Sequence, residues 1–210
     1  MGTVGEPSAS EILETTAAAI RVCTLCGLHA GRTHAVPGEG SSIADVFLIG
    51  EAPGKDEDAS GRPFVGSAGK ILDKALGLVR LPRGSVFITN VVKCRPPKNR
   101  KPLTDEMGSC RPYLMAQIAA VKPSVIVTLG RTALRDLLGP GMELKSARTK
   151  RLAFGDVPVV PTYHPAAVLY NRKLEAAIQR DLRKATRMVR TGGARRRTTA
   201  SREGGTRATR

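Results

Sequence analysis

Apolar residues along this chain of 210 residues follow two alternating patterns. Short, mostly apolar runs predict four buried β-strands, at residues 44–50, 85–92, 124–130 and 157–165. Apolar positions three and four residues apart predict helices at 8–23, 68–80, 131–139 and 172–190, and one that begins near Thr104. Because strands and helices alternate, we expect an α/β fold: a three-layer α/β/α sandwich around a central, mostly parallel four-stranded sheet.

The two ends of the chain lack this patterning. We expect residues 1–9 and 190–210 to be disordered and 10–189 to form one domain. The sequence contains no run of 18 apolar residues and no signal-peptide pattern at its start. These features predict a cytoplasmic protein without a membrane span, and we expect it to be a monomer.

Charge changes this picture more than any other property of the composition. The chain has 34 Lys and Arg against 18 Asp and Glu, a formal net charge of +16. The segment 190–210 accounts for +6, from seven Arg and one Glu, so residues 1–189 keep +10. A basic domain favours a polyanionic partner, most often a nucleic acid, although basicity alone also occurs in proteins with no such partner.

Polar residues follow several predicted strands at their carboxyl ends, where open α/β sheets bind ligands. The first strand leads into the residues GEAPG, Asn90 lies near the end of the second, and His164 follows the fourth. GEAPG matches neither a Walker A loop nor a dinucleotide-binding fingerprint, which disfavours a nucleoside triphosphatase. Phe64 lies in a glycine-rich segment. Its ring is suited either to stack on a planar base or to pack as a buried apolar side chain under the loop.

Four cysteines form the other candidate site. Cys23 and Cys26 are a C-x-x-C pair, and Cys94 and Cys110 bracket a basic loop. Four thiolates suit either zinc or an iron–sulfur cluster, and the spacing alone does not choose between them. The plainer interpretation is four unlinked buried thiols.

Five blocks of sequence together resemble one known family. They are GEAPG with the following GRPFVGSAG, then TNVVKCRPPKNR, CRPYL and PTYHPAAVLY, preceded by the C-x-x-C pair. In this order and spacing they closely resemble the family 4 uracil-DNA glycosylases of the uracil-DNA glycosylase superfamily, over roughly residues 10–188. The resemblance implies a DNA repair enzyme that flips uracil out of double- or single-stranded DNA and hydrolyses its N-glycosidic bond.

The resemblance also implies roles for individual residues. The uracil pocket would be formed by Gly50, Glu51, Ala52, Phe64, Asn90 and His164. Glu51 and His164 would be catalytic, and Glu57 would exclude the methyl group of thymine. A [4Fe–4S] cluster would be held by Cys23, Cys26, Cys94 and Cys110. DNA would be contacted by Lys93, Arg95, Lys98, Arg100, Lys101, Arg148, Ala166 and Leu169.

Two departures from related sequences matter. Other branches of the superfamily carry Asp where this chain has Ala52, so water activation would either fall to Glu51 or be weak, with stabilisation of the leaving group dominant. Thr149 stands where many relatives have glycine. The basic loop between Cys94 and Cys110 contains no histidine, which disfavours the branch that is trapped covalently on its product.

Two other kinds of protein would share some of these features. A non-catalytic iron–sulfur or zinc DNA-binding module would explain the cysteines and the charge, but it would not need Glu51, Asn90 and His164 together. A small-molecule α/β enzyme would explain the fold, but not the four cysteines or the arginine-rich end. Any repair or replication partner stays unknown from the sequence.

Overall fold

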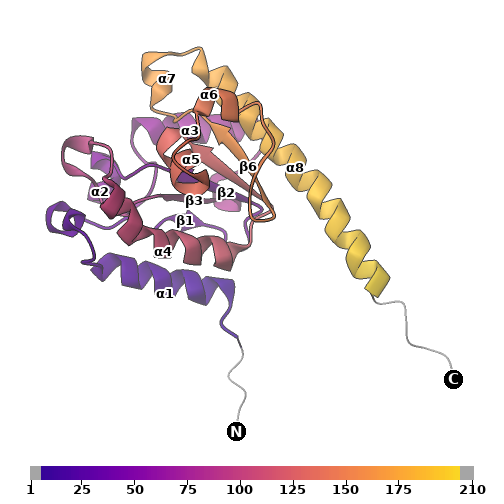
Figure 1. Ribbon diagram of the computed structural model, residues 1–210, viewed down its shortest axis with the longest axis horizontal. Helices are drawn as coiled ribbons and strands as arrows, with labels where there is room; N and C mark the ends of the chain where they lie inside the picture. The colour runs from indigo at the N-terminus through magenta and orange to yellow at the C-terminus, as the bar shows by residue number, and fades with distance from the viewer. Residues whose placement is uncertain (1–5, 204–210) are drawn as a thin grey trace, which may run out of the picture.

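The computed structural model describes residues 6–203, with side chains as far as Arg190. One six-stranded sheet runs through the centre, in the order β1-β3-β2-β4-β6-β5 (Figure 1). Its strands are β1 (Glu39–Gly40), β2 (Val46–Gly50), β3 (Phe87–Asn90), β4 (Val125–Leu129), β5 (Leu152–Phe154) and β6 (Val157–Thr162). The helices are α1 (Ala9–Val22), α2 (Lys55–Ser60), α3 (Ser67–Leu78), α4 (Thr104–Val121), α5 (Arg131–Leu138), α6 (Leu144–Ala147), α7 (Ala167–Tyr170) and α8 (Leu174–Glu203).

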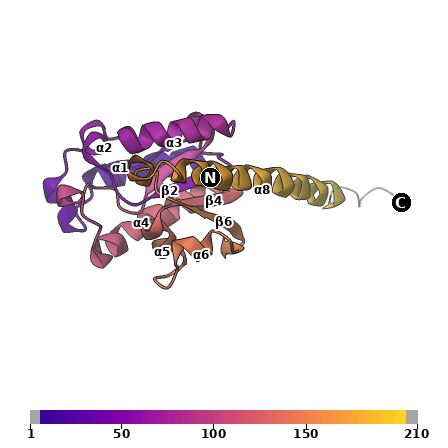
Figure 2. The ribbon, with the colours of Figure 1, turned by 90° about the horizontal axis from the view of Figure 1, so that it is seen from above.

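The four inner strands are parallel, as the sequence predicts, and helices cover both faces of the sheet. Side chains of successive strand residues point to opposite faces. Phe47 and Ile49 of β2 pack in the core shared with α1, α4 and α5, whereas Val46 and Leu48 pack in the core shared with α3 and α8. Figure 2 shows α3 and α4 on opposite sides of the strands. The predicted three-layer α/β/α sandwich is therefore confirmed.

The prediction of four strands was wrong, because it omitted the two edge strands, β1 and β5. β1 and β5 have two and three residues, and each lies antiparallel beside its neighbour. Such short segments cannot display the alternation that identifies a strand in a sequence. The helices α2, α6 and α7, of four to six residues, were missed for the same reason.

The first helix lies where the sequence predicts it, and the last helix is longer than predicted. α1 begins at Ala9, where Ser8 and Glu11 form a reciprocal capping box, with Glu11 N to Ser8 Oγ at 3.3 Å and Ser8 N to Glu11 Oε2 at 2.7 Å. α8 is helical as far as Glu203, although disorder was expected from residue 190. Alanine and arginine favour helix, and no proline interrupts this segment. Residues 1–5 and 204–210, which belong to the ends predicted to be disordered, lie outside the described residues.

The strand order reverses at β2, because β3 and β4 lie on its two sides. Parallel α/β sheets bind ligands beyond the carboxyl ends of their strands at such a reversal. The ends of β2, β3 and β4 and the segment after β6 therefore meet where a ligand site is expected. Within residues 6–203, no helix is long and apolar enough to cross a membrane.

Candidate active site

A cavity of about 440 Å³ opens at this reversal point. Its wall includes Glu51, Ala52, Glu57, Phe64, Asn90, His164 and Ala166, and Pro96, Asn99 and Arg100 border it from the basic loop. The structure thus brings together the polar residues that the sequence placed at separate strand ends. A cavity of this size can enclose a single planar base.

Asn90 is the most informative residue in the cavity wall. It ends β3, is 1% exposed, and neither its amide oxygen nor its amide nitrogen has a hydrogen-bond partner among the described residues. Buried polar atoms are nearly always paired, because an unpaired one loses its hydration without compensation. An unpaired donor and acceptor on one cavity wall therefore indicate a ligand that supplies the complementary pair.

Gly50 brings the backbone of β2 close to the cavity. A Cβ atom built at Gly50 would lie 2.5 Å from Phe64 Cζ, and nearer still to the amide oxygen of Asn90. Only glycine leaves room for the Phe64 ring and the Asn90 amide to sit against the strand end. This close approach explains the glycine that directly follows the first apolar run.

His164 and Phe64 both line the cavity and lie beside each other, with ring centroids 5.7 Å apart and planes tilted by 31°. Burial lowers the pKa of His164, while the charges of Glu51 and Glu57 act in the opposite direction. The backbone N–H of Ala166 donates to His164 Nδ1 at 3.2 Å. Because Nδ1 accepts this bond, the neutral ring carries its proton on Nε2, which makes Nε2 a hydrogen-bond donor.

Glu51 follows β2 directly and lines the cavity. Its carboxylate accepts a hydrogen bond from the hydroxyl of Thr132, the second residue of α5. Sequence reasoning noted the residues GRTA after the third strand but did not single out Thr132. A hydroxyl at the start of a helix that follows a buried strand was the available signal.

Glu57 is buried, and its carboxylate accepts hydrogen bonds from three backbone N–H groups. Its carboxylate accepts from Gly54 at 3.0 Å, Val65 at 2.8 Å and Gly66 at 2.9 Å. Asp56, Glu57 and Asp58, which follow GEAPG, lie in the first turn of α2. Glu57 also fixes the turn that carries Phe64. The carboxylate also borders the cavity.

Two of the residues that we expected to contact DNA have side chains that bind other parts of the protein instead. Lys93 is 1% exposed, and its ammonium donates to Thr89 Oγ1 at 2.6 Å, to the Asn90 carbonyl at 2.7 Å and to Gln117 Oε1 at 2.8 Å. Burial lowers the pKa of Lys93 to about 7. The prediction that Lys93 contacts a DNA phosphate was wrong, because its side chain points into the core.

Arg148 is engaged in the same way. Its guanidinium donates twice to Asp181, at 2.8 and 3.1 Å, and lies 4.5 Å from the centre of the Tyr163 ring. Contrary to expectation, this arginine tightens the packing of α8 against the loop after α6.

Of the other expected DNA contacts, Arg100 and Ala166 line the cavity. Lys98 and Lys101 are exposed, Arg95 donates to Asn99, and Arg100 pairs with Glu106 at 2.6 Å. Ala166 lines the cavity and Leu169, in α7, is 56% exposed. The basic loop, through Pro96, Asn99 and Arg100, and the residue before α7, Ala166, therefore border the same cavity.

The four cysteines come together as a separate site. Cys23 caps α1, Cys110 lies on α4, and together with Cys26 and Cys94 they line one small cavity. Arg32 donates to Cys94 Sγ at 3.2 Å and the backbone N–H of Lys93 donates to Cys110 Sγ at 3.4 Å. Burial raises the pKa of Cys110 to about 11. In the described part of the chain, no three Cys, His, Asp or Glu side chains already form a group that could hold a metal ion.

Comparison with known proteins places this geometry in context. A sequence profile described as "Uracil DNA glycosylase superfamily" matches residues 37–187. The type-4 uracil-DNA glycosylase of Pyrobaculum aerophilum is 48% identical over 171 residues, covering 78% of this chain and 87% of that protein. The enzymes of the same name from Saccharolobus solfataricus and Thermotoga maritima are 45% and 40% identical over 181 and 187 residues, covering 82% and 87% of this chain and 84% and 97% of those proteins.

The matches span most of the chain and include the strand ends that form the base-sized cavity. The chain therefore belongs to the uracil DNA glycosylase superfamily and, within it, to the type-4 uracil-DNA glycosylases.

Proposed function

We propose that this protein flips uracil out of DNA and hydrolyses its N-glycosidic bond, leaving an abasic site and free uracil. The observation that carries the proposal is the buried, unpaired amide of Asn90. Uracil presents an acceptor at O4 beside a donor at N3, which one carboxamide can pair. Cytosine presents the opposite pattern, so its binding would leave groups of the site unpaired and the base would be rejected.

The cavity holds the extrahelical base between backbone and ring. Gly50, Glu51 and Ala52 supply the strand end, and Phe64 stacks on the face of the base. Because the reacting bond is inaccessible in a stacked duplex, the nucleotide must be rotated out of the helix before it can enter. The family membership and the 440 Å³ cavity both support this arrangement.

His164 stabilises the leaving group. Cleavage places negative charge on the departing uracil, and a fixed donor near O2 lowers the energy of that state. The neutral ring with its proton on Nε2 can provide this hydrogen bond, and the lowered pKa keeps the ring neutral near pH 7.

Glu51 acts on the sugar side. Its carboxylate orients a water molecule and stabilises positive character on the sugar, and the hydroxyl of Thr132 fixes its position. With Ala52 in place of an aspartate, no second carboxylate stands directly beside it in the sequence. Glu57 excludes the thymine methyl group, a role supported by its place in the cavity wall and by the three N–H bonds that hold it rigidly.

Cys23, Cys26, Cys94 and Cys110 would hold a [4Fe–4S] cluster. The donor set fits, since four thiols from three separate segments share one cavity and two of them accept N–H hydrogen bonds. When bound, the cluster supplies structural cross-linking rather than chemistry at the base. It ties the end of α1 to the basic loop and to α4.

DNA is bound around the cavity mouth by Arg95, Lys98, Arg100 and Lys101, while Ala166 and Leu169 wedge into the minor groove. The arginine-rich end adds non-specific, salt-sensitive affinity. We propose uracil in double- and single-stranded DNA as substrate, a monomeric protein, and a cytoplasmic location at the nucleoid.

The experiment is a glycosylase assay on a labelled oligonucleotide with one uracil, followed by alkaline strand cleavage. Wild type is compared with Asn90→Ala and His164→Ala, with Asn171→Ala as an exposed asparagine control. We expect uracil-dependent scission by wild type and by the control, and its loss in the two cavity variants. Tight DNA binding without scission by protein with its metal site filled would instead indicate a non-catalytic DNA-binding module.

A further inference from the structure

Phe64 has an unusual backbone conformation. Its φ angle is 51°, in the left-handed region that residues with side chains seldom adopt, and the residue is 5% exposed. Such strain persists only where the surroundings hold it in place. The turn that carries this aromatic ring must therefore be fixed by contacts with the residues around it.

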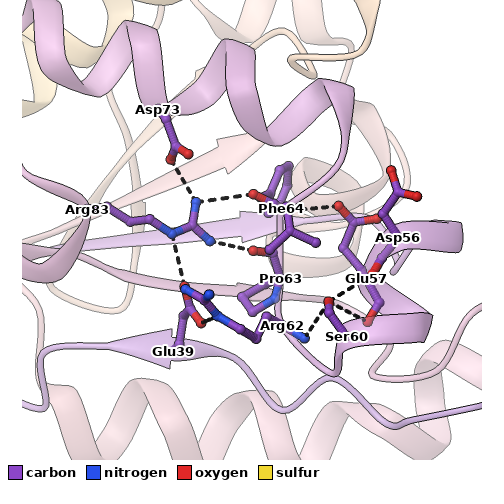
Figure 3. Close-up of polar contacts among 10 residues, drawn as sticks. Glu39, Asp56, Glu57, Ser60, Arg62, Pro63, Phe64, Asp73 and Arg83 are labelled. Carbon is purple, nitrogen blue, oxygen red and sulfur yellow. Dashed lines mark hydrogen bonds and ion pairs between the residues drawn. The ribbon is translucent and has the colours of Figure 1, made fainter.

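Arg83 makes the contacts on one side of this turn (Figure 3). Its Nη1 donates to the carbonyl of Phe64 at 3.2 Å, and its Nη2 donates to the carbonyl of Pro63. One planar guanidinium thus holds two successive carbonyl groups in a fixed direction. Gly69 makes this orientation possible, because a Cβ atom there would clash with the backbone of Phe64.

Glu57 holds the other side of the same turn. Its Oε1 accepts the N–H groups of Val65 and Gly66, the two residues that follow Phe64. The turn therefore has its carbonyls bound by a cation and its N–H groups bound by an anion, from opposite sides (Figure 3).

Arg83 is itself fixed by two carboxylates. Its Nε donates to Glu39 at 2.9 Å and its Nη1 to Asp73 of α3 at 2.7 Å. Arg62 also pairs with Glu39, at 2.8 Å, but its side chain is 61% exposed, and among the described residues the Phe64 carbonyl is held by Arg83. Glu39 therefore pairs with both Arg62 and Arg83, and Arg83 is the one that hydrogen-bonds the turn.

We propose that Arg83 is a positioning residue for uracil excision, which keeps Phe64 in its left-handed conformation so that the ring covers the flipped base. Arg83 is not among the described residues that line the cavity, so it acts through Phe64 and not on the substrate. The proposal rests on the stacking role given to Phe64 in the proposed function.

The experiment is a double-mutant cycle in single-turnover uracil excision. The variants are Arg83→Met, Phe64→Ala and the double variant, with Arg62→Met as the matched control and thermal unfolding measured for each. Arg83→Lys is included because it keeps the positive charge near Glu39 and Asp73 but presents no planar fork, which guards against a methionine variant that fails to fold. Binding to uracil-free DNA is measured in parallel.

We expect Arg83→Met to lower the excision rate about tenfold while DNA affinity stays near wild type, and Arg62→Met to stay within about twofold. Arg83→Lys should fall in between. In the Phe64→Ala background, removal of Arg83 should change the rate by less than about twofold, because the ring it positions is gone.

Equal losses in both backgrounds would overturn the proposal, since Arg83 would then act independently of Phe64. An active folded Arg83→Met or Arg83→Lys with wild-type rate would overturn it too. A wild-type protein that releases no uracil would instead refute the proposed function. An unimpaired Phe64→Ala would refute the stacking role of Phe64, and with it the role of Arg83, while leaving uracil excision itself intact.

Discussion

Gly50→Ala adds one methyl group at the end of β2, against the Phe64 ring and the Asn90 amide that line the base cavity. Ordinary Cβ contacts are essentially never shorter than 3.0 Å, yet the new Cβ would lie 2.5 Å from Phe64 Cζ and 2.7 Å from Phe64 Cε2, with the Asn90 amide oxygen nearer still. The ring must therefore retreat by at least 0.5 Å, the difference between 3.0 and 2.5 Å, and the amide by more.

A misplacement of about 1 Å in a catalytic constellation can lower a rate about 100-fold. We expect Gly50→Ala to lower uracil excision by about that factor, while overpacking lowers the free energy of unfolding by about 1–3 kcal/mol. Because φ at Gly50 is not positive, the backbone itself accepts alanine. The loss should thus come from the displaced cavity groups.

The assay is single-turnover release of uracil from an oligonucleotide, with enzyme in excess and below the unfolding temperature. Gly77→Ala is the matched control, since nothing lies within 4 Å of its new methyl group and it stands inside α3. The control should keep its rate and gain about 0.5–1 kcal/mol of stability. A Gly50→Ala variant that excises uracil within threefold of wild type would refute the close fit of Gly50, Phe64 and Asn90.

Three further results are expected. Burial lowers the pKa of His164 below its usual 6.5, so the unfolded chain binds the proton more readily. Wild type should therefore lose stability relative to His164→Asn as pH falls below about 6.5. The same difference in free energy of unfolding between the two proteins at about pH 5 and about pH 8 would contradict this. Cys94→Ser should lose iron and visible absorbance and unfold several degrees lower, about 4 °C or more, whereas unchanged iron content would exclude Cys94 as a ligand. Ser8→Ala removes the α1 capping box and should cost about 1 kcal/mol with no change in excision rate, so an altered rate would link α1 to the active site.

The central strands and long helices could be predicted from the sequence because they are long enough to show a period. β2 is an unbroken apolar run, and α3 and α5 repeat their apolar positions with helical spacing. The sheet edges could not be predicted, because two or three residues carry no period. Their pairing depends on strands that are distant in the chain.

The members of the cavity were also predictable, since parallel strands bring their ends to one edge. The orientation of charged residues was not. Lys93 stands in a basic stretch, yet its ammonium points inward to Thr89 and Gln117, which lie 4 and 24 residues away. The roles of Arg83 and Thr132 depend likewise on contacts between segments that no local pattern links.

Recognition of uracil by the Asn90 amide is tested most directly by changing the amide to a carboxyl group of the same shape. The measurement is the free base released from matched uracil- and cytosine-containing oligonucleotides by wild type and by Asn90→Asp. Wild type should release uracil and no cytosine, and Asn90→Asp should lose uracil release by about 100-fold or more, because a carboxylate cannot donate to O4. Wild-type rates of uracil release by Asn90→Asp would contradict the account.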